Sequence, residues 1–230
     1  MSETALLALA HSVAVLLALG LAFHALPDDW LVRRTRARQA GLGALAGAMG
    51  IVLMLTPWQS VPGAFFDARS VLLAVTGLFF GPIAAAIAMA ACAALRLWQG
   101  GDAAATGLAV IALSGLAGLA WRRWRARPAE DMRAAELFAF GVAVHVATLA
   151  ALLALPEASR GRIASAVAPT VLGIFPVATM LLGMLLGKWV RGARTAEALR
   201  LSEARLRLAL DASRQGSFDI DLVKIGRAHV

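Results

Sequence analysis

The chain has a single cysteine, Cys92, so it cannot form an intrachain disulfide. It also lacks a metal-binding motif, a P-loop, a nucleophile elbow and paired acidic residues that could form a catalytic cleft. Nothing in these residues argues for catalysis, and we expect neither a cofactor nor a metal ion. The net charge of +8 comes without an interleaved aromatic and basic surface, so we expect no nucleic-acid partner.

Apolar residues, in contrast, make up 60% of the 230 residues. A helix needs about 20 apolar residues to cross a hydrocarbon core of roughly 30 Å. The long apolar stretches are 5–26, 40–57, 70–98, 103–121, 135–155 and 165–188. The sequence therefore predicts an all-α polytopic membrane bundle. Its first stretch lacks the basic start and the cleavage site of a signal peptide, so we expect a retained transmembrane helix within residues 1–30.

Arginine-rich segments separate the apolar stretches and predict an orientation. Basic residues gather in RRTRAR (33–38), in RRWRAR (122–127) and in the segment from Lys188 onward. Short loops rich in lysine and arginine stay on the cytoplasmic side of a membrane. We therefore expect a multi-pass protein of the plasma (inner) membrane, with the lipid bilayer as a partner, the N-terminus outside and the C-terminus cytoplasmic.

This orientation gives residues 70–98 an unusual path. Stretch 40–57 leaves the cytoplasm and stretch 103–121 returns to it, so residue 102 must lie outside. Residues 70–98 also begin outside, and they therefore make no net crossing. The expected architecture is five full crossings plus a broken or re-entrant hairpin at 70–98.

A helix break near the middle of 70–98 has a physical cause in Gly81 and Pro82. Proline lacks a backbone donor and disfavours helix at the residue before it. The two halves, 70–80 and 83–95, are each too short to cross a membrane alone. The alternative is one straight crossing, with some loops that disobey the charge rule.

Two arginines, Arg69 and Arg96, bracket the uncharged part of this segment. Two convergent guanidiniums can clamp a small carboxylate or phosphate through bidentate, charge-assisted hydrogen bonds. Asp67 could orient one arginine, and Gly100 and Gly101 would allow the backbone to approach the anion closely. Alternatively, the arginines extend separately to lipid phosphates while Asp67 caps the following helix.

Two histidines, His11 and His145, fall inside apolar stretches. A histidine within a membrane span can respond to pH or bind a ligand. Neither has a second ligand at a recognisable spacing, so we expect structural hydrogen bonds instead.

The character of the chain changes after residue 190. Residues 191–214 are charged and rich in helix formers, with Leu199, Leu206 and Leu210 at helical spacing. We expect a cytoplasmic connector helix that pairs in a homodimer as a short coiled coil, or else a plain linker. Residues 216–222 then alternate as a strand does.

The stretch 62–101, with its elements PGAFFDAR, GLFFGP and LRLWQGG, resembles the 5TMR-LYT family of LytS/YhcK-type five-transmembrane sensor domains. The resemblance covers residues 31–190 and implies a sensor of bacterial histidine kinases and cyclic-di-GMP enzymes, some of which respond to small carboxylates such as pyruvate. It also implies that Arg69 and Arg96 contact the ligand. Family members carry a polar or thiol residue after the glycine pair, where this chain has only Thr106, and this leaves the ligand's identity open.

Residues 204–222 are similar to the start of a PAS domain, which would make 215–224 the beginning of a truncated one. The last six residues, IGRAHV (225–230), are the peptide that the start of a common sequencing adapter encodes. We therefore expect 225–230 to be an assembly artefact and the natural protein to continue.

Together these features predict the sensory input module of a bacterial signal-transduction protein. Such a module would bind a small anionic ligand and signal through the connector helix to a PAS-linked histidine kinase, as in two-component systems, or to a diguanylate cyclase. The alternative is a small-solute transporter or substrate-capture membrane subunit, because broken helices are also typical of transporters. The connector favours the sensor, since a transporter needs no such extension.

Overall fold

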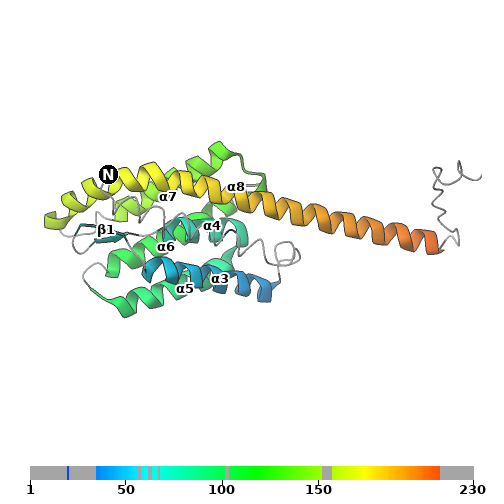
Figure 1. Ribbon diagram of the computed structural model, residues 1–230, viewed down its shortest axis with the longest axis horizontal. Coiled ribbons are helices and arrows are strands. Elements are labelled where there is room, and N and C mark those ends of the chain that lie inside the picture. The colour runs from blue at the N-terminus through cyan, green and yellow to red at the C-terminus, as the bar shows by residue number, and fades with distance from the viewer. Residues whose placement is uncertain are drawn as a thin grey trace, which may run out of the picture.

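The computed structural model describes residue 20 and residues 35–55, 58–61, 64–66, 68–101, 104–151 and 157–212. Its elements are α3 (Arg36–Leu55), β1 (Trp58–Val61), β2 (Ala64–Phe66), α4 (Arg69–Phe80), α5 (Pro82–Gln99), α6 (Ala104–Trp124), the 3-10 turn η1 (Ala129–Asp131), α7 (Ala134–Ala151) and α8 (Glu157–Ala212). Figure 1 shows these helices packed lengthwise into a bundle, with α8 extending beyond it.

The helices confirm a polytopic helical membrane protein. Within the described residues, four helical segments are long and apolar enough to cross a membrane: α3, α5, α6 and the part of α8 from Val171 onward. Two further apolar helices, α4 and α7, are shorter. Stretch 5–26 lies outside the described residues, apart from Gly20.

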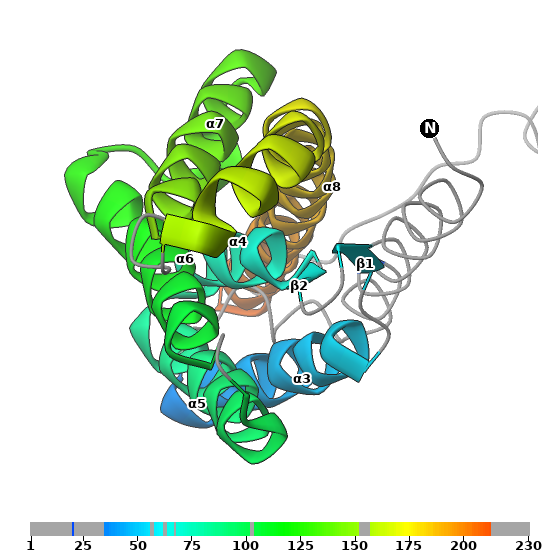
Figure 2. The same ribbon diagram turned by 90° about the vertical axis from the view of Figure 1, so that its left-hand side faces the viewer.

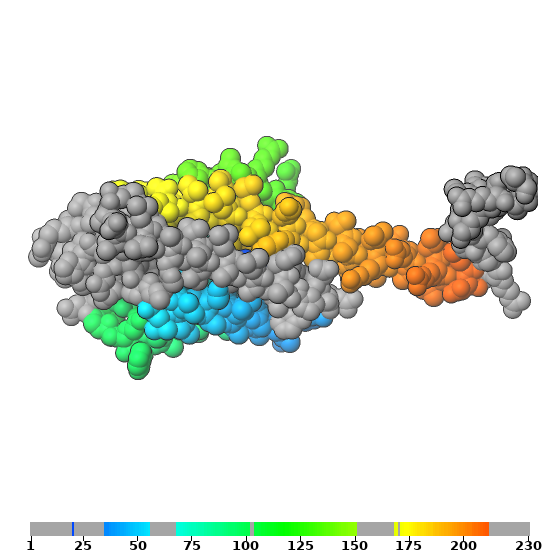
Figure 3. Space-filling model, in the orientation of Figure 1, coloured from blue at the N-terminus to red at the C-terminus, as the bar shows by residue number. Residues whose placement is uncertain are grey.

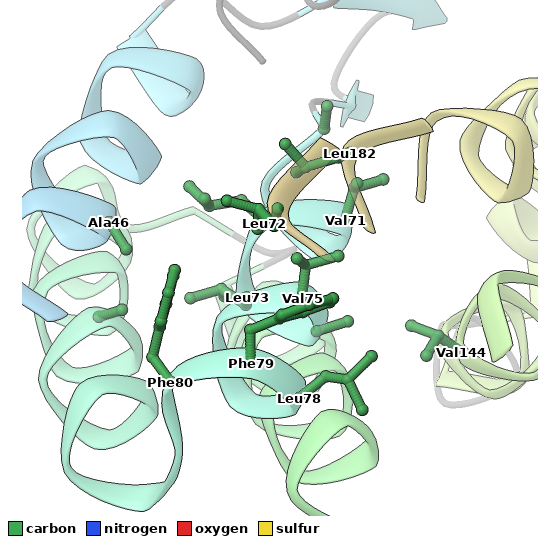
Figure 4. Packing of buried hydrophobic residues seen from close by; sticks show 14 of the residues in the cluster. Ala46, Val71, Leu72, Leu73, Val75, Leu78, Phe79, Phe80, Val144 and Leu182 are labelled. Carbon is green, nitrogen blue, oxygen red and sulfur yellow. The ribbon is translucent and has the colours of Figure 1, made fainter. Parts of the chain in front are cut away.

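Helix α4 forms the centre of the bundle. Every residue from Ser70 to Phe80 is buried, and α4 contacts α3, α5, α6, α7 and α8. Figure 2 shows the other helices surrounding it, and Figure 4 shows Val71, Leu72 and Phe79 among side chains from neighbouring helices. A helix that is apolar on all sides is a buried helix, so the short stretch 70–80 forms the core of the bundle.

Small residues let the neighbouring helices approach closely. A β-carbon at Gly43 of α3 would lie 2.7 Å from the carbonyl oxygen of Ala84 in α5. One at Gly77 of α4 would lie 2.7 Å from the carbonyl oxygen of Gly115 in α6. Such contacts replace the hydrophobic driving force that helices lack inside a lipid bilayer.

The contacts also fix the direction of each helix. Gly43 lies against Ala84, and Gly50 lies against Cys92, so α3 and α5 run in parallel. The end of α6 lies beside the end of α4, because Arg122 donates hydrogen bonds to the last carbonyls of α4. Helix α4 therefore runs toward Arg122, and α5 returns from it.

Helices α7 and α8 run antiparallel, since Gly141 packs on Pro176 while Gly187 lies beside Glu130. The basic segments around Arg36, Arg122 and Arg194 thus gather at one end of the bundle. We call this the basic end, and we call the end that holds Arg96 the opposite end.

Two features differ from the sequence predictions. The half-helix expected at 83–95 is too short to cross a membrane, but α5 continues to Gln99 and is long and apolar enough to cross. The second feature lies between the predicted stretches 40–57 and 70–98, where the antiparallel strands β1 and β2 form and Trp58 pairs with Phe66. Aromatic and β-branched residues on both sides of Pro62-Gly63 explain the hairpin, since this dipeptide is typical of turns.

The predicted connector falls within the C-terminal part of α8. It does not form a helix separate from the last apolar stretch, because α8 is a single helix of 56 residues from Glu157 to Ala212. At 1.5 Å per residue it is about 84 Å long. Figure 3 shows its C-terminal part projecting away from the bundle at the basic end, with Leu199 and Leu206 exposed.

Candidate functional site

The first predicted ligand residue, Arg69, is the first residue of α4. Its side chain is half-buried, and its Nε atom is shielded from solvent. The next residue, Ser70, is already in the core. A charge at the tip of the central helix therefore sits below the surface of the bundle rather than on it.

The second, Arg96, belongs to the last turns of α5 and lies directly over α6. It continues the inward-facing row formed by Ala84, Ala88 and Cys92 at four-residue spacing. A β-carbon at Gly107 of α6 would lie only 2.5 Å from Arg96 Nε, and that Nε atom is buried. Arg96 Nη1 also donates a 3.4 Å hydrogen bond to the side-chain oxygen of Gln99. The guanidinium therefore depends on the missing side chain at Gly107 for its position.

Arg69 and Arg96 lie at the same level of the bundle. A β-carbon at Gly50 would lie 2.5 Å from Cys92 Sγ and 3.6 Å from Leu72 Cδ2, so Cys92 and Leu72 share one level. One helical turn toward the opposite end from that level leads to Arg96 on α5 and to the start of α4 on the other side. The fold thus brings both arginines near the same end, on antiparallel neighbouring helices.

The glycine pair follows immediately. Gly100 ends α5 with a φ of 63° and donates its N–H to the carbonyl of Arg96, and Gly101 has a φ of 87°. Both φ values are in the region that favours glycine. Asp67, the remaining predicted ligand residue, lies outside the described residues.

The predicted hinge at Gly81 and Pro82 falls where α4 ends and α5 begins. Gly81 has a φ of 92°, which side chains disfavour, and Pro82 occupies the first turn of α5, where a missing donor costs nothing. The chain reverses direction here, at the basic end.

Arg122 stabilises this reversal, and the sequence interpretation missed its role. Its Nη1 donates hydrogen bonds of 3.0 and 2.8 Å to the carbonyls of Leu78 and Phe79. These carbonyls belong to the last turn of α4, which has no intrahelical partners for them and carries partial negative charge. The sequence indicated only that Arg122 belongs to a basic cluster at the membrane surface. The rotation of α6 turns Arg122 toward α4 and leaves the neighbouring Arg123 exposed.

His145 connects three helices by structural contacts. Its Nδ1 lies 2.6 Å from the carbonyl of Gly141, so Nδ1 carries the proton and donates. Its Nε2 lies 3.3 Å from Ser70 Oγ of α4 and accepts the hydroxyl proton. The ring also packs on Phe175 of α8, with centroids 5.3 Å apart. These contacts agree with the predicted structural role, while His11 lies outside the described residues.

The described residues hold no group of three His, Cys, Asp or Glu side chains that could bind a metal ion. A model of a known family, described as the 5TMR of 5TMR-LYT, matches residues 22–188 of the chain. The chain belongs to the 5TMR-LYT family. The 5TMR-LYT domain is a membrane sensory module of signalling proteins. No curated protein and no solved structure matches the chain.

The basic end of this 5TMR-LYT domain holds α8 where it leaves the bundle. Glu130, in the turn η1, is only 3% exposed and forms an ion pair with Arg194 of α8. Arg191 of α8 donates a hydrogen bond to the backbone carbonyl of Glu130. These contacts hold α8 at the point where it leaves the bundle, and we call Glu130, Arg191 and Arg194 the α8 joint.

A second ion pair supports the α8 joint. Arg125 binds both carboxylate oxygens of Glu136 through Nε and Nη2, in the bidentate geometry that is typical of strong arginine–carboxylate pairs. It also donates hydrogen bonds to the carbonyls of Arg127 and Pro128. The segment between α6 and α7 is thereby folded against the start of α7. Sequence patterns indicated the basic clusters, but nothing in the sequence identified these acidic partners.

Proposed function

We propose that this 5TMR-LYT domain is a sensory input module that binds a small carboxylate between Arg69 and Arg96. The observation that carries the proposal is the shared level of the two half-buried arginines on antiparallel helices. Guanidiniums held partly out of water bind a carboxylate more strongly than exposed ones do, because the lower local dielectric strengthens each hydrogen bond. Gly100 and Gly101 leave room for the anion, and Asp67 orients one arginine when the site is empty.

Ligand binding acts on the bundle through the ends of α4 and α5. A carboxylate shared by Arg69 and Arg96 draws the start of α4 toward the end of α5. Because α4 is buried on all sides, its displacement is passed to the helices that surround it. Ser70 transmits the change to His145 of α7, and Arg122 transmits it to α6. The ligand selects one of two bundle arrangements according to its affinity for each.

The signal leaves through α8 as a rearrangement of the connector. We place the arginine site outside the cytoplasm and the C-terminus within it, with five full crossings plus the α4–α5 hairpin in the plasma membrane. The exposed Leu199 and Leu206 lie seven residues apart on α8, which supports pairing of two copies into a short coiled coil. Beyond residue 214, the output is a PAS-linked histidine kinase or diguanylate cyclase.

The second candidate function is capture or transport of a small solute. The break at Gly81 and Pro82, which divides one apolar segment into α4 and α5, favours this second function. Broken helices form the substrate sites of many transporters. The long projecting part of α8 favours the sensor, because it serves no purpose in moving a solute.

A ligand titration tests the carboxylate site. The purified chain, in detergent, is titrated with pyruvate by isothermal calorimetry beside Arg69→Ala, Arg96→Ala and Arg123→Ala. We expect each of the first two variants to bind about 10- to 100-fold more weakly, the effect of losing charge-assisted hydrogen bonds. The exposed Arg123, at the basic end, is the control and should leave the affinity unchanged.

Equal affinity of Arg69→Ala, Arg96→Ala and wild type would reject the site. Topology is tested separately, with a reporter fused at residue 102. An extracytoplasmic result supports the proposed orientation, and a cytoplasmic result contradicts it.

A further inference from the structure

A cavity of about 320 Å³ lies at the basic end, far along α5 and α6 from the proposed carboxylate site. Four arginines line it: Arg122, Arg125, Arg127 and Arg194. Its volume is at the lower end of the range for small-molecule sites, which is about 300–1,000 Å³. Leu78 and Pro128 complete part of its wall.

The charges around the cavity favour an anion. No acidic side chain is among the described residues that line it. Glu136 and Glu130, which pair with Arg125 and Arg194, are not among the residues that line the cavity. The carboxylates thus fix the orientation of two guanidiniums, and the described lining of the cavity itself contains only basic, apolar and small residues. Guanidiniums from different segments around one cavity can together match the several acceptor oxygens of a phosphate group.

The position of the cavity indicates where such a phosphate comes from. Arg125 and Arg127 lie within three residues after Trp124, the last residue of the apolar helix α6. In a membrane, residues just beyond an apolar helix lie at the level of the lipid head groups, where basic pockets bind anionic lipids. Arg194 contributes from α8, so an occupant would contact both the segment after α6 and the connector.

We propose that this arginine-lined cavity binds a phosphate group, supplied by an anionic phospholipid or by free phosphate. The occupant joins the segment after α6 to α8, beside the α8 joint. The site is independent of the carboxylate site, since the two share no residue and lie at different ends of the bundle.

The test uses two probes with the purified chain. Native mass spectrometry measures retention of added phosphatidylglycerol against phosphatidylcholine, and calorimetry measures binding of inorganic phosphate. Arg127→Gln is the test variant, because the Arg127 side chain is exposed and reaches the cavity without carrying any described contact of the fold. Arg123→Gln is the matched control, since it removes the same charge from an exposed side chain at the end of α6, four residues earlier and outside the cavity lining.

We expect wild type to bind either phosphatidylglycerol or inorganic phosphate. Arg123→Gln should bind that probe with the same affinity as wild type, and Arg127→Gln should bind it about tenfold more weakly. Arg127→Lys keeps the charge but loses the guanidinium fork, and we expect an intermediate affinity. Retention of phosphatidylglycerol alone identifies a lipid as the source, whereas binding of inorganic phosphate identifies the free anion. Failure of both probes to bind wild type, or equal losses in Arg123→Gln and Arg127→Gln, would overturn the proposal.

Discussion

The two ends of the bundle both carry arginines but use them differently. At the basic end, Arg122 and Arg125 bind backbone carbonyls and Arg194 binds a buried carboxylate, so these side chains tie one helix end to another. At the opposite end, Arg96 lies over Gly107, and Arg69 stands at the tip of the central helix. The same residue type thus builds a joint at one end and a candidate anion site at the other, depending on whether its neighbours are carbonyls and carboxylates or a glycine and a helix tip.

The largest loss of stability should follow from Arg122→Ala at the basic end. It leaves the Leu78 and Phe79 carbonyls at the end of α4 without their donor. Two hydrogen bonds from a charged group predict a loss of about 3 kcal/mol in the free energy of unfolding. Thermal unfolding in detergent measures it, with exposed Arg123→Ala as the control. Equal stability of the two variants would mean that the α4 terminus does not depend on Arg122.

The next largest effect is expected from Glu130→Gln, which removes the negative charge that pairs with Arg194 in the α8 joint. Breaking one partner of a buried ion pair should cost about 2–3 kcal/mol, toward the lower end of the usual range because Arg194 remains partly exposed. We also expect faster proteolysis of α8 near Arg194. The double variant Glu130→Arg/Arg194→Glu should recover part of the loss, and no recovery would indicate that the charge pairing is not what holds α8.

At the opposite end, Gly107→Ala should affect ligand affinity more than stability. The added methyl group occupies the space of Arg96 Nε, and the flexible arginine can move away at little cost. We expect pyruvate to bind about tenfold more weakly, a change of about 1.4 kcal/mol in binding free energy. Gly173→Ala is the matched control, because nothing lies within 4 Å of its β-carbon. Tight binding by Gly107→Ala would place the ligand away from Arg96.

The smallest effect should come from Ser70→Ala, which removes the hydroxyl that His145 Nε2 accepts from. A single buried hydrogen bond predicts a loss of about 1 kcal/mol in stability. Ligand affinity should change by less than it does in Arg69→Ala. A large loss of pyruvate binding in Ser70→Ala, at unchanged stability, would give the Ser70–His145 pair a role in the site itself.

The sequence predicted the helical membrane bundle and the position of the turn in residues 70–98. It could do so because a glycine followed by a proline interrupts a helix through local backbone chemistry alone. The charged loops also predicted that Arg69 and Arg96 share one side of the membrane, and this stays a prediction, because the helix contacts give their level in the bundle and not its orientation in a membrane.

The roles of Arg122 and Glu130 could not be predicted from the sequence. Arg122 and Arg123 are adjacent and identical, and only the rotation of α6 against α4 decides which one reaches Leu78. Glu130 stands among basic residues, but its burial depends on the packing of α8 against η1. The continuity of α8 through residue 190 was likewise not predicted. The composition changes there because the surroundings of the helix change from apolar to aqueous, while the backbone stays helical.

Because α8 is uninterrupted, its bundle part and its projecting part can move as one rigid rod. Its pivot is the α8 joint at Arg194, and the 18 residues from there to Ala212 form an arm of about 27 Å. The arm on the bundle side is longer, because α8 begins at Glu157, about 55 Å before Arg194. A tilt of that arm is therefore reproduced at the far end at about half its amplitude, whereas a rotation about the helix axis arrives undiminished. Because a helix has no slack between its turns, a small displacement of α8 beside His145 would reach Ala212 at the end of the helix.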